Sequence, residues 1–269
     1  MITISSRQNP FVHHCRDLAR RRDAAGGEIL LDGLHLLSDA LAAGVPIAAA
    51  AAPDAFWQSP AGVPVARALE IGGAQIYAAS PAVIEAASPV RTPSGIVAVA
   101  RWQPAEPERV LEAQPALVVC AVEVQDPGNV GAIIRSADAA GATGVVVTAG
   151  SADPFGWKAL RGSMGSAFRL PVAAGASLVE VCREARRRGV RIISTTPASG
   201  VGLYEADLSG PVMVLLGGEG AGLPPALQDA ADARLSIPMR PPVESLNVAV
   251  AAAVILYEAR RQRPGAPAS

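Results

Sequence analysis

The sequence has few cysteines, few aromatic residues, a single lysine and no long apolar run. Its three cysteines, Cys15, Cys120 and Cys182, lie far apart, so they form neither a disulfide framework nor a C-x-x-C metal site. Such sparse cysteine is typical of a reducing compartment, and we expect a cytoplasmic protein without a metal site. No apolar run approaches the roughly 18–20 residues of a membrane-spanning helix, and the polar N-terminus does not resemble a signal sequence. We therefore expect no membrane association.

A large net charge is also missing, because 23 basic residues face 24 acidic residues and the formal net charge is -1. The balance excludes the global positive field of a histone-like protein, so a nucleic-acid partner must meet a local basic patch. A basic arm with helical spacing fills the first 22 residues, and its one acid is Asp17. The arm is either an ordinary solvated helix face or an RNA contact. Its arginines are Arg7, Arg16, Arg20, Arg21 and Arg22.

The chain is long enough for one large or two modest domains, with 269 residues of which 50% are hydrophobic. In residues 1–100, short apolar runs alternate with helical spacing, which predicts a small α/β domain. Residues 101–115 hold three prolines and three glutamates, a composition suited to a surface linker. We assign residues 116–264 to a second domain and residues 265–269 to a frayed tail.

The second domain shows a regular alternation of strand-like and helical segments. Continuous apolar runs at 117–124, 144–148, 190–194 and 212–217 are separated by helical spacing. Fully apolar strands are buried on both faces, which is typical of parallel sheets covered by helices on both sides. This pattern predicts an α/β fold with a mainly parallel sheet.

Two polar side chains follow the first of these strands. Residues 122–131 read as a buried strand that enters the segment QDPGNVG and then a helix. Ligands of open α/β sheets bind at such carboxyl strand ends. Asn129 either caps the helix or faces a ligand, and Arg135 either pairs with Asp138 or belongs to the same site.

A glycine-rich loop, GGEGAGLP, follows the strand at 212–217. The loop lacks the Lys-Ser/Thr ending of a P-loop, and Leu223 stands where a dinucleotide-binding fingerprint needs its last glycine. Nucleotide hydrolysis and dinucleotide binding are therefore disfavoured. Glycines let the backbone approach a ligand closely, so the loop either cradles a ligand beside Glu219 or is a plain tight turn.

The third candidate region joins a short strand at 235–239, a proline-rich loop and an alanine-rich helix. Ser245 or Asn247 caps this helix if the region is purely structural, and Pro264 ends it. The small residues of the helix permit close packing, either in a core or at a subunit interface.

Taken together and in this order, the three regions resemble the SpoU/TrmH family of RNA 2′-O-ribose methyltransferases in the SPOUT superfamily. The resemblance runs from about residue 117 to 263 and includes the segment KALRGSMGSAFRLPV at 158–172. Residues 1–100 resemble, more loosely, the substrate-binding domain of the family. The motifs that carry the resemblance are Asn129 with Arg135, Gly218-Glu219-Gly220, Ile237-Pro238-Met239 and Ser245-Leu246-Asn247-Val248.

The resemblance implies a fold, a cofactor and an assembly. The second domain would be a SPOUT domain with a deep C-terminal trefoil knot, and two copies would form a homodimer with active sites near the interface. The implied methyl donor is S-adenosylmethionine. The residues that would bind it are Leu216, Gly217, Gly218, Ile237, Met239 and Leu246.

The resemblance also implies the catalytic set, which is Asn129, Arg135, Glu219, Ser245 and Asn247. The pKa of a guanidinium is above about 12, so the group stays protonated at neutral pH. Arg135 is therefore better suited to holding a phosphate or stabilising a developing alkoxide than to acting as a base.

The implied reaction needs a ribose 2′-hydroxyl, which RNA has and DNA lacks. The N-terminal domain and its basic arm would select a structured site, and by analogy within the family we expect large-subunit ribosomal RNA. The alternatives are a transfer RNA substrate, and a non-catalytic RNA-binding or ribosome-assembly factor with the same fold. The intact catalytic set argues against the non-catalytic alternative.

Overall fold

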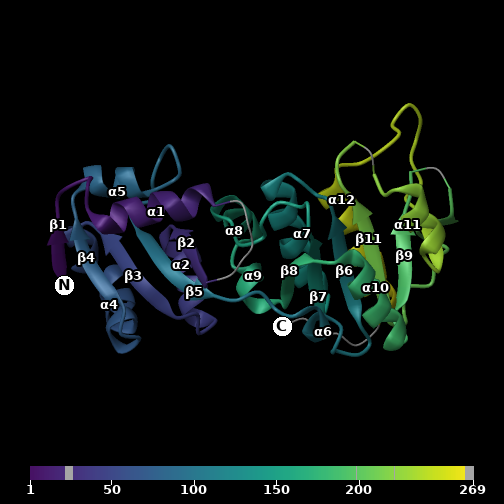
Figure 1. The fold of residues 1–269 in the computed structure, drawn as a ribbon, viewed down its shortest axis with the longest axis horizontal. Helices are drawn as coiled ribbons and strands as arrows, with labels where there is room; N and C mark the ends of the chain where they lie inside the picture. Colours follow the sequence, from purple (N-terminus) through teal and green to yellow (C-terminus); the bar gives the residue numbers. More distant parts are fainter. Residues whose placement is uncertain (22–26, 198, 221, 264–269) are drawn as a thin grey trace.

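Two sheets lie side by side along the long axis of the molecule, and each carries its own helices (Figure 1). The computed structural model describes residues 1–21, 27–197, 199–220 and 222–263. Arg22 of the basic arm and the predicted tail at 265–269 lie outside the described residues. The N-terminus lies at the free end of the first sheet (Figure 1).

The N-terminal sheet is mixed. Its elements are β1 (Ile2–Ile4), α1 (Pro10–Arg20), β2 (Gly27–Asp32), α2 (Leu34–Ala42), β3 (Ile47–Ala52), α3 (Asp54–Trp57), α4 (Gly62–Ile71), β4 (Gln75–Ala79), α5 (Pro81–Ala87) and β5 (Val97–Trp102). The strand order is β1-β4-β3-β5-β2, with β5 antiparallel to both of its neighbours. The α/β fold predicted for this part of the chain is confirmed.

The C-terminal sheet has seven strands, all paired in parallel. The elements of this region are α6 (Pro107–Val110), β6 (Leu117–Val122), α7 (Pro127–Ala140), β7 (Gly144–Thr148), α8 (Trp157–Ser163), α9 (Ser166–Arg169), β8 (Val172–Ala176), α10 (Leu178–Arg187), β9 (Arg191–Thr195), β10 (Val201–Gly202), β11 (Val212–Gly217), α11 (Pro225–Ala230), β12 (Ala233–Ser236) and α12 (Val248–Gln262). The strand order is β10-β12-β9-β11-β6-β7-β8, which confirms the predicted parallel sheet.

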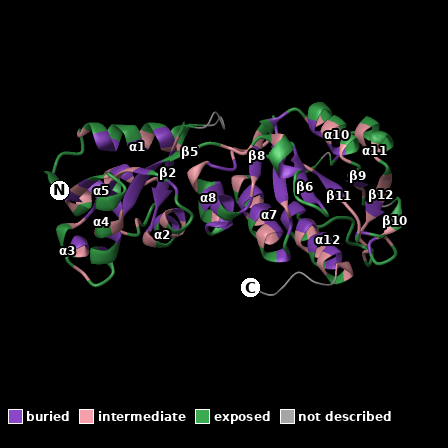
Figure 2. Ribbon diagram, turned by 90° about the horizontal axis from the view of Figure 1, so that it is seen from below, coloured by how far each residue is buried: buried purple, intermediate pink, exposed green. Residues whose placement is uncertain are grey.

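Helices cover both faces of the C-terminal sheet, so its central strands are buried on both sides (Figure 2). On one face, Val119 packs in a core with Ile133 of α7 and Ile255 of α12. On the other face, Cys120 packs in a second core with Val181 of α10. Successive side chains of a strand point to opposite faces, so one fully apolar strand supplies both cores.

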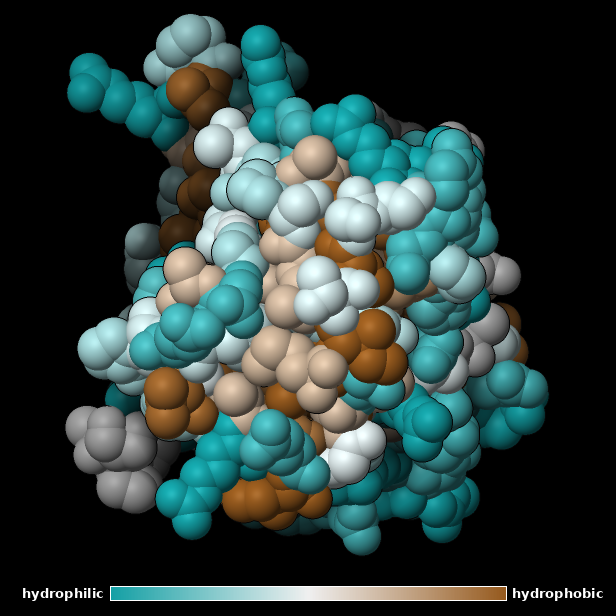
Figure 3. All heavy atoms as spheres, turned by 90° about the vertical axis from the view of Figure 1, so that its left-hand side faces the viewer, coloured by the Kyte–Doolittle hydropathy of each residue, from teal (hydrophilic) through white to brown (hydrophobic). Residues whose placement is uncertain are grey.

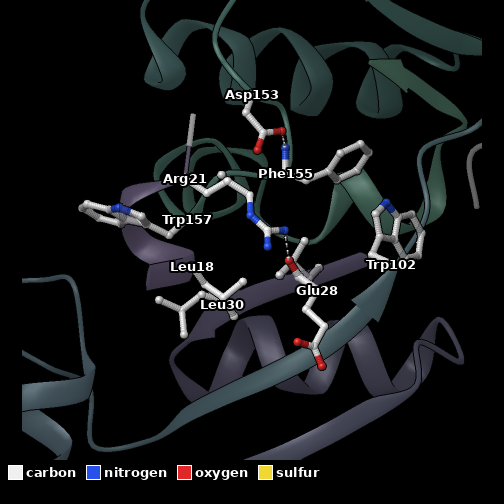
Figure 4. A pocket seen from close by; sticks show the side chains of 10 residues that line it. Leu18, Arg21, Glu28, Leu30, Trp102, Asp153, Phe155 and Trp157 are labelled. Atoms are coloured by element: carbon white, nitrogen blue, oxygen red, sulfur yellow. Dashed lines mark hydrogen bonds between the residues drawn. The ribbon is translucent and has the colours of Figure 1, made fainter. Parts of the chain in front are cut away.

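The two sheets share one continuous core, and α8 lies against β2 between them (Figure 2). Trp102, at the end of β5, packs against Phe155 in a tilted arrangement and against Phe168 edge-to-face, with ring centroids 5.7 Å and 5.2 Å away. A crevice of about 20 Å³ remains at this junction, where Arg21 of the basic arm lies close to Trp157 (Figure 4).

The linker expected at 101–115 is not simply a surface segment. Val110 and Leu111 are fully buried and pack in the core with α10. The apolar pair lies among prolines and glutamates, and the polar composition of these neighbours led to the prediction of an exposed segment. This short helix therefore helps to cover one face of the C-terminal sheet.

The outer end of the N-terminal sheet has a mixed surface, where apolar residues lie among hydrophilic ones (Figure 3). Exposed apolar side chains in this part of the molecule include Ile2 on β1 and Val63 and Ile71 on α4.

Among the described residues, no helix is both long and apolar enough to cross a membrane.

Candidate active site

A cavity of about 470 Å³ opens where β9, β11 and β12 end and α12 begins. Small-molecule sites are commonly about 300–1,000 Å³, so its size suits a nucleoside-sized ligand. The three strand ends come from distant parts of the chain, and the parallel sheet brings them to one edge. All the residues predicted to bind the cofactor line this cavity: Leu216, Gly217, Gly218, Ile237, Met239 and Leu246.

One wall of the cavity is a backbone wall that admits only glycine. A Cβ atom on Gly217 would lie 2.4 Å from the carbonyl carbon of Gly222, and one on Gly218 would lie 2.1 Å from the carbonyl oxygen of Glu123. Glu123 itself has a φ of 54°, in the left-handed region that non-glycine residues rarely adopt. The loop backbone is therefore packed tightly against itself and Glu123, and both glycines line the cavity.

A chain of hydrogen bonds joins the three predicted motifs at the rim of the cavity. Asn129 Nδ2 donates to Glu219 Oε1 at 2.5 Å, and Asn247 Nδ2 donates to Asn129 Oδ1 at 3.0 Å. The backbone N–H of Gln125 donates to the other Glu219 oxygen at 3.4 Å. Because an ionised carboxylate can only accept, Glu219 fixes which way both amides point.

The helix caps decide between the alternatives left open by the sequence. Asp126, rather than Asn129, caps α7, and its Oδ1 accepts from the Asn129 backbone N–H at 2.9 Å. The alternative that Asn129 caps α7 is therefore wrong, and its side chain instead hydrogen-bonds to Glu219 and Asn247 at the cavity rim. Asn247 caps α12 by accepting from the backbone N–H groups of Ala249 and Val250.

The model of the SpoU rRNA Methylase family matches residues 116–257 of this chain. The chain belongs to the SpoU family. An uncharacterised tRNA/rRNA methyltransferase of Synechocystis is 36% identical over 97% of this chain and 94% of that protein. The 23S rRNA (guanosine(2553)-2′-O)-methyltransferase RlmP of Bacillus subtilis is 38% identical over 70% of this chain and 73% of that protein. The AdoMet-bound rRNA methyltransferase of Sinorhizobium meliloti has a TM-score of 0.85 at 32% identity, covering 96% of this chain and 97% of that one.

Membership confirms the family prediction and what it implied about the type of enzyme. This SpoU-family protein is an RNA methyltransferase that uses S-adenosylmethionine. The confirmed α/β fold with its parallel sheet is the family fold, which includes the deep trefoil knot.

The residues around the cavity fit S-adenosylmethionine. The glycine loop offers a wall without side chains, along which the backbone can approach an adenosine closely. Leu216, Ile237 and Leu246 supply apolar surface, and the Glu219 carboxylate supplies negative charge at the rim for a cationic donor. When bound, this cofactor supplies a methyl group attached to a sulfonium, whose sulfur is a good leaving group because it departs as a neutral thioether.

Arg135 lies outside the cavity lining of a single SpoU-family chain. It is exposed on α7, six residues after Asn129, which corresponds to a rise of about 9 Å along the helix. The alternative that it pairs with Asp138 is wrong, because Asp138 pairs with Arg169 at 2.9 Å. Ser245, in contrast, lines the cavity and does not cap α12.

The arginines of the basic arm have different environments. Arg7 forms an exposed ion pair with Glu85 at 3.5 Å, and Arg16 donates to the backbone oxygen of Ala86 at 2.8 Å, so Arg16 ties α1 to α5. Arg21 donates to the backbone oxygen of Glu28 at 3.3 Å. Arg20 is exposed at the end of α1. An RNA contact by the arm stays a prediction.

Several lining residues were not predicted from the sequence. Thr195 ends β9, and Thr196 and Pro197 follow it; the rule that ligands bind at carboxyl strand ends would have found them. Gln228 of α11 also lines the cavity, and its Nε2 donates to the backbone oxygen of Leu223 at 2.8 Å. Gln228 therefore holds the far side of the glycine loop, a role that no local pattern reveals.

The cysteines do not belong to this site. None of the three lines the cavity within the described part of the chain. Burial raises the pKa of Cys15 to about 12 and raises the pKa of Cys120 further. Both thiols are therefore protonated and poor nucleophiles at neutral pH.

Proposed function

We propose that this SpoU-family enzyme transfers a methyl group to a ribose 2′-hydroxyl in large-subunit ribosomal RNA. The observation that carries the proposal is the rim network, in which Glu219, Asn129 and Asn247 hold fixed polar groups beside a nucleoside-sized cavity. The names of the related proteins support the substrate, since RlmP is a 23S rRNA 2′-O-methyltransferase. Such a substrate also places the enzyme in the cytoplasm.

In the proposed reaction, S-adenosylmethionine would be held by the cavity residues Leu216, Gly217 and Ile237 and would supply the methyl group, for which the ribose 2′-hydroxyl would be the acceptor. The rim amides of Asn129 and Asn247 orient the ribose, and Ser245 lies on the same wall. Because a guanidinium carries a positive charge, Arg135 stabilises the developing alkoxide or holds the neighbouring phosphate. Orientation of the hydroxyl and the donor methyl supplies most of the acceleration.

We further propose that two copies form a homodimer through the exposed side of α12. Val250 and Tyr257 are seven residues apart, so they lie on one face of the helix, and they are 49% and 53% exposed. Val243 and Leu246, which precede the helix, are exposed too. A second copy on this face would bring a symmetry-related α7 and α12 close to the rim and supply the Arg135 that a single cavity lacks.

Methyl transfer to defined RNAs tests the proposal. With labelled S-adenosylmethionine, unmodified 23S rRNA transcript should accept label and a transfer RNA transcript should not. Arg135→Ala should abolish transfer and keep cofactor affinity within a few fold, because Arg135 lies away from the cofactor cavity. Transfer to the transfer RNA transcript instead of the 23S rRNA transcript would contradict the proposed substrate.

A further inference from the structure

Three helices on one side of the C-terminal sheet carry uncompensated positive charge. Together α7, α8 and α9 contain four basic residues and a single acid, Asp138. Asp138 is neutralised by Arg169 at 2.9 Å. The other three basic side chains are exposed, and within the described residues none of them forms an ion pair. They are Arg135, Lys158 and Arg161.

The crossing of α7 and α8 brings these charges together. A Cβ atom on Gly131 would lie 2.4 Å from the Ala159 oxygen, so the two backbones touch. A Cβ atom on Gly162 would lie 3.5 Å from the Gly128 oxygen. A Cβ atom on Gly162 would also lie 3.4 Å from the Gly131 Cα atom, so the two helices cross at Gly131 and Gly162.

This geometry sets the relative positions of the three cations. Arg135 lies about one turn beyond Gly131, and Arg161 directly precedes Gly162, so both cations lie within about one turn of the helix crossing. Lys158 and Arg161 are three residues apart, so they are neighbours on the surface of α8. The Lys158 ammonium lies 5.4 Å from the centroid of the Trp157 ring.

The charged strip is continuous with the basic arm. Trp157, whose ring lies beneath the Lys158 ammonium, lines the same crevice as Arg21 (Figure 4). Arg20 precedes Arg21 in the chain and is exposed at the end of α1. Exposed cations therefore run from the N-terminal sheet across the junction to α7, the helix whose first turn carries Asn129.

We infer that Lys158 and Arg161 bind the phosphate backbone of the RNA substrate and lead it from the basic arm to Arg135. The inference rests on the proposed function, since it assumes an RNA substrate. Arg135, Lys158 and Arg161, which form no ion pair within the described part of the chain, complement a phosphate backbone, with lysine acting as a point charge and arginine as a forked donor. Lys158 and Arg161 need no base-specific contact, because phosphate contacts position a protein on a nucleic acid and contacts with base edges recognise its sequence.

The test compares RNA binding by the wild-type protein and the Lys158→Ala/Arg161→Ala variant over a range of salt concentrations. The probe is unmodified 23S rRNA transcript. Loss of two phosphate contacts should reduce the slope of log affinity against log salt by about 1.4 to 1.8. At 0.1 M salt the same loss should weaken binding roughly 25- to 60-fold. Affinity for S-adenosylmethionine should not change, which also reports that the variant is folded.

The matched control is Arg109→Ala/Arg183→Ala, which removes two exposed arginines from α6 and α10 on the opposite face of the sheet. This control should bind RNA as the wild type does, and Lys158→Arg/Arg161→Lys should restore the salt slope. Equal slopes for the wild type and the alanine pair, or an equal loss in the control, would overturn the inference alone. Failure of the wild-type protein to bind this RNA would overturn the proposed function as well.

Discussion

Asn129 links the two ends of the rim network, and no other described side chain bonds both Glu219 and Asn247. Its position depends on Asp126, whose side chain caps α7 and so leaves the Asn129 amide free. The amide donates to a carboxylate on one side and accepts from an amide on the other. A single side chain therefore sets the orientation of groups contributed by three distant segments.

We expect Asn129→Ala to lower kcat for methyl transfer roughly 100-fold, the scale expected when a positioned group moves by about 1 Å. Cofactor affinity should stay within a few fold, because Asn129 does not line the cavity. Steady-state kinetics and calorimetric titration with S-adenosylmethionine measure the two quantities. The control is Gln58→Ala, which removes an exposed amide bonded to Asp54. An unchanged kcat would contradict the role given to Asn129.

Gly218→Ala tests the backbone wall of the cavity. The new Cβ atom would lie 2.1 Å from the Glu123 oxygen, so the loop must shift. A shift of this kind costs roughly 1–3 kcal/mol, so cofactor affinity should fall roughly 5- to 150-fold. Gly210→Ala is the control, because its Cβ atom would meet nothing within 4 Å. Equal affinity in the two variants would show that the wall tolerates a side chain.

At the residue scale, the sequence predicted which side chains gather but not how they divide their roles. Asp126 next to Pro127 is a recognisable helix start, with a capping residue before a proline, and this signal would have corrected the role of Asn129. The hydrogen bonds from Asn129 to Glu219 and from Asn247 to Asn129 join residues 90 and 118 positions apart. Local patterns carry no information about contacts at that separation.

At the scale of elements, α12 is fastened to the loop before β11 by side chains near its end. Gln262 Nε2 donates to the Ala206 oxygen at 2.9 Å, and its Oε1 accepts from the Leu208 backbone N–H at 2.7 Å. Glu258 holds Gln262 in place by accepting from its amide at 2.7 Å, and it accepts twice from Arg261. Because α12 begins at the cavity rim with Asn247, this anchor also stabilises the site.

The Glu258 anchor predicts a pH-dependent stability. Hydrogen bonds from Arg261 and Gln262 lower the pKa of Glu258 from its ordinary value of 4.5 to about 2. A lowered folded-state pKa adds stability above the unfolded-state pKa, and this stability is lost as pH falls through the folded-state value.

We therefore expect the free energy of unfolding of the wild type to exceed that of Glu258→Gln by a constant amount between pH 7 and 5. The gap should shrink below about pH 4.5 and close near pH 2. Urea unfolding at a series of pH values measures this gap, with Glu70→Gln on the exposed side of α4 as control. A gap that persists unchanged at pH 2 would contradict the assignment.

Element prediction succeeded where a strand is uniformly apolar and failed where it is not. Strands β7 and β11 consist of long apolar runs, and their predicted bounds match the structure. Strand β8 has the sequence VAAGA, which lacks large apolar side chains, and β10 is only two residues long. These strands owe their conformation to pairing with β7 and β12, so local sequence did not reveal them.

At the scale of the whole molecule, Trp102 connects the two sheets through its aromatic contacts with Phe155 and Phe168. Among the described buried side-chain polar atoms, its indole Nε1 is the one without a hydrogen-bond partner. The ring is therefore held by packing rather than by its polar group.

We expect Trp102→Ala to lower the free energy of unfolding by roughly 2–3 kcal/mol, somewhat less than the loss for a fully buried aromatic side chain. Trp102→Phe keeps the ring contacts and removes the unpaired N–H group, so it should stay within about 1 kcal/mol of the wild type. Urea unfolding followed by circular dichroism measures both variants. Equal stability of the alanine variant and the wild type would show that the junction contributes little.

The order of the strands is the part of the molecule that sequence reasoning could not supply. Alternating apolar runs predicted a parallel sheet, but β11 lies between β9 and β6, and β12 lies beyond β9. That order brings the ends of β9, β11 and β12 to one cavity. The order is a property of the family fold, and it entered the prediction through the resemblance of three motifs.

The most direct test of the account is the position of the transferred methyl group. A 2′-O-methyl group removes the hydroxyl that alkali uses to cleave the adjacent phosphodiester bond. After transfer from labelled S-adenosylmethionine to 23S rRNA and complete alkaline hydrolysis, the account predicts that label is recovered in alkali-stable dinucleotides. Label recovered only in mononucleotides would place the methyl group on a base and contradict it.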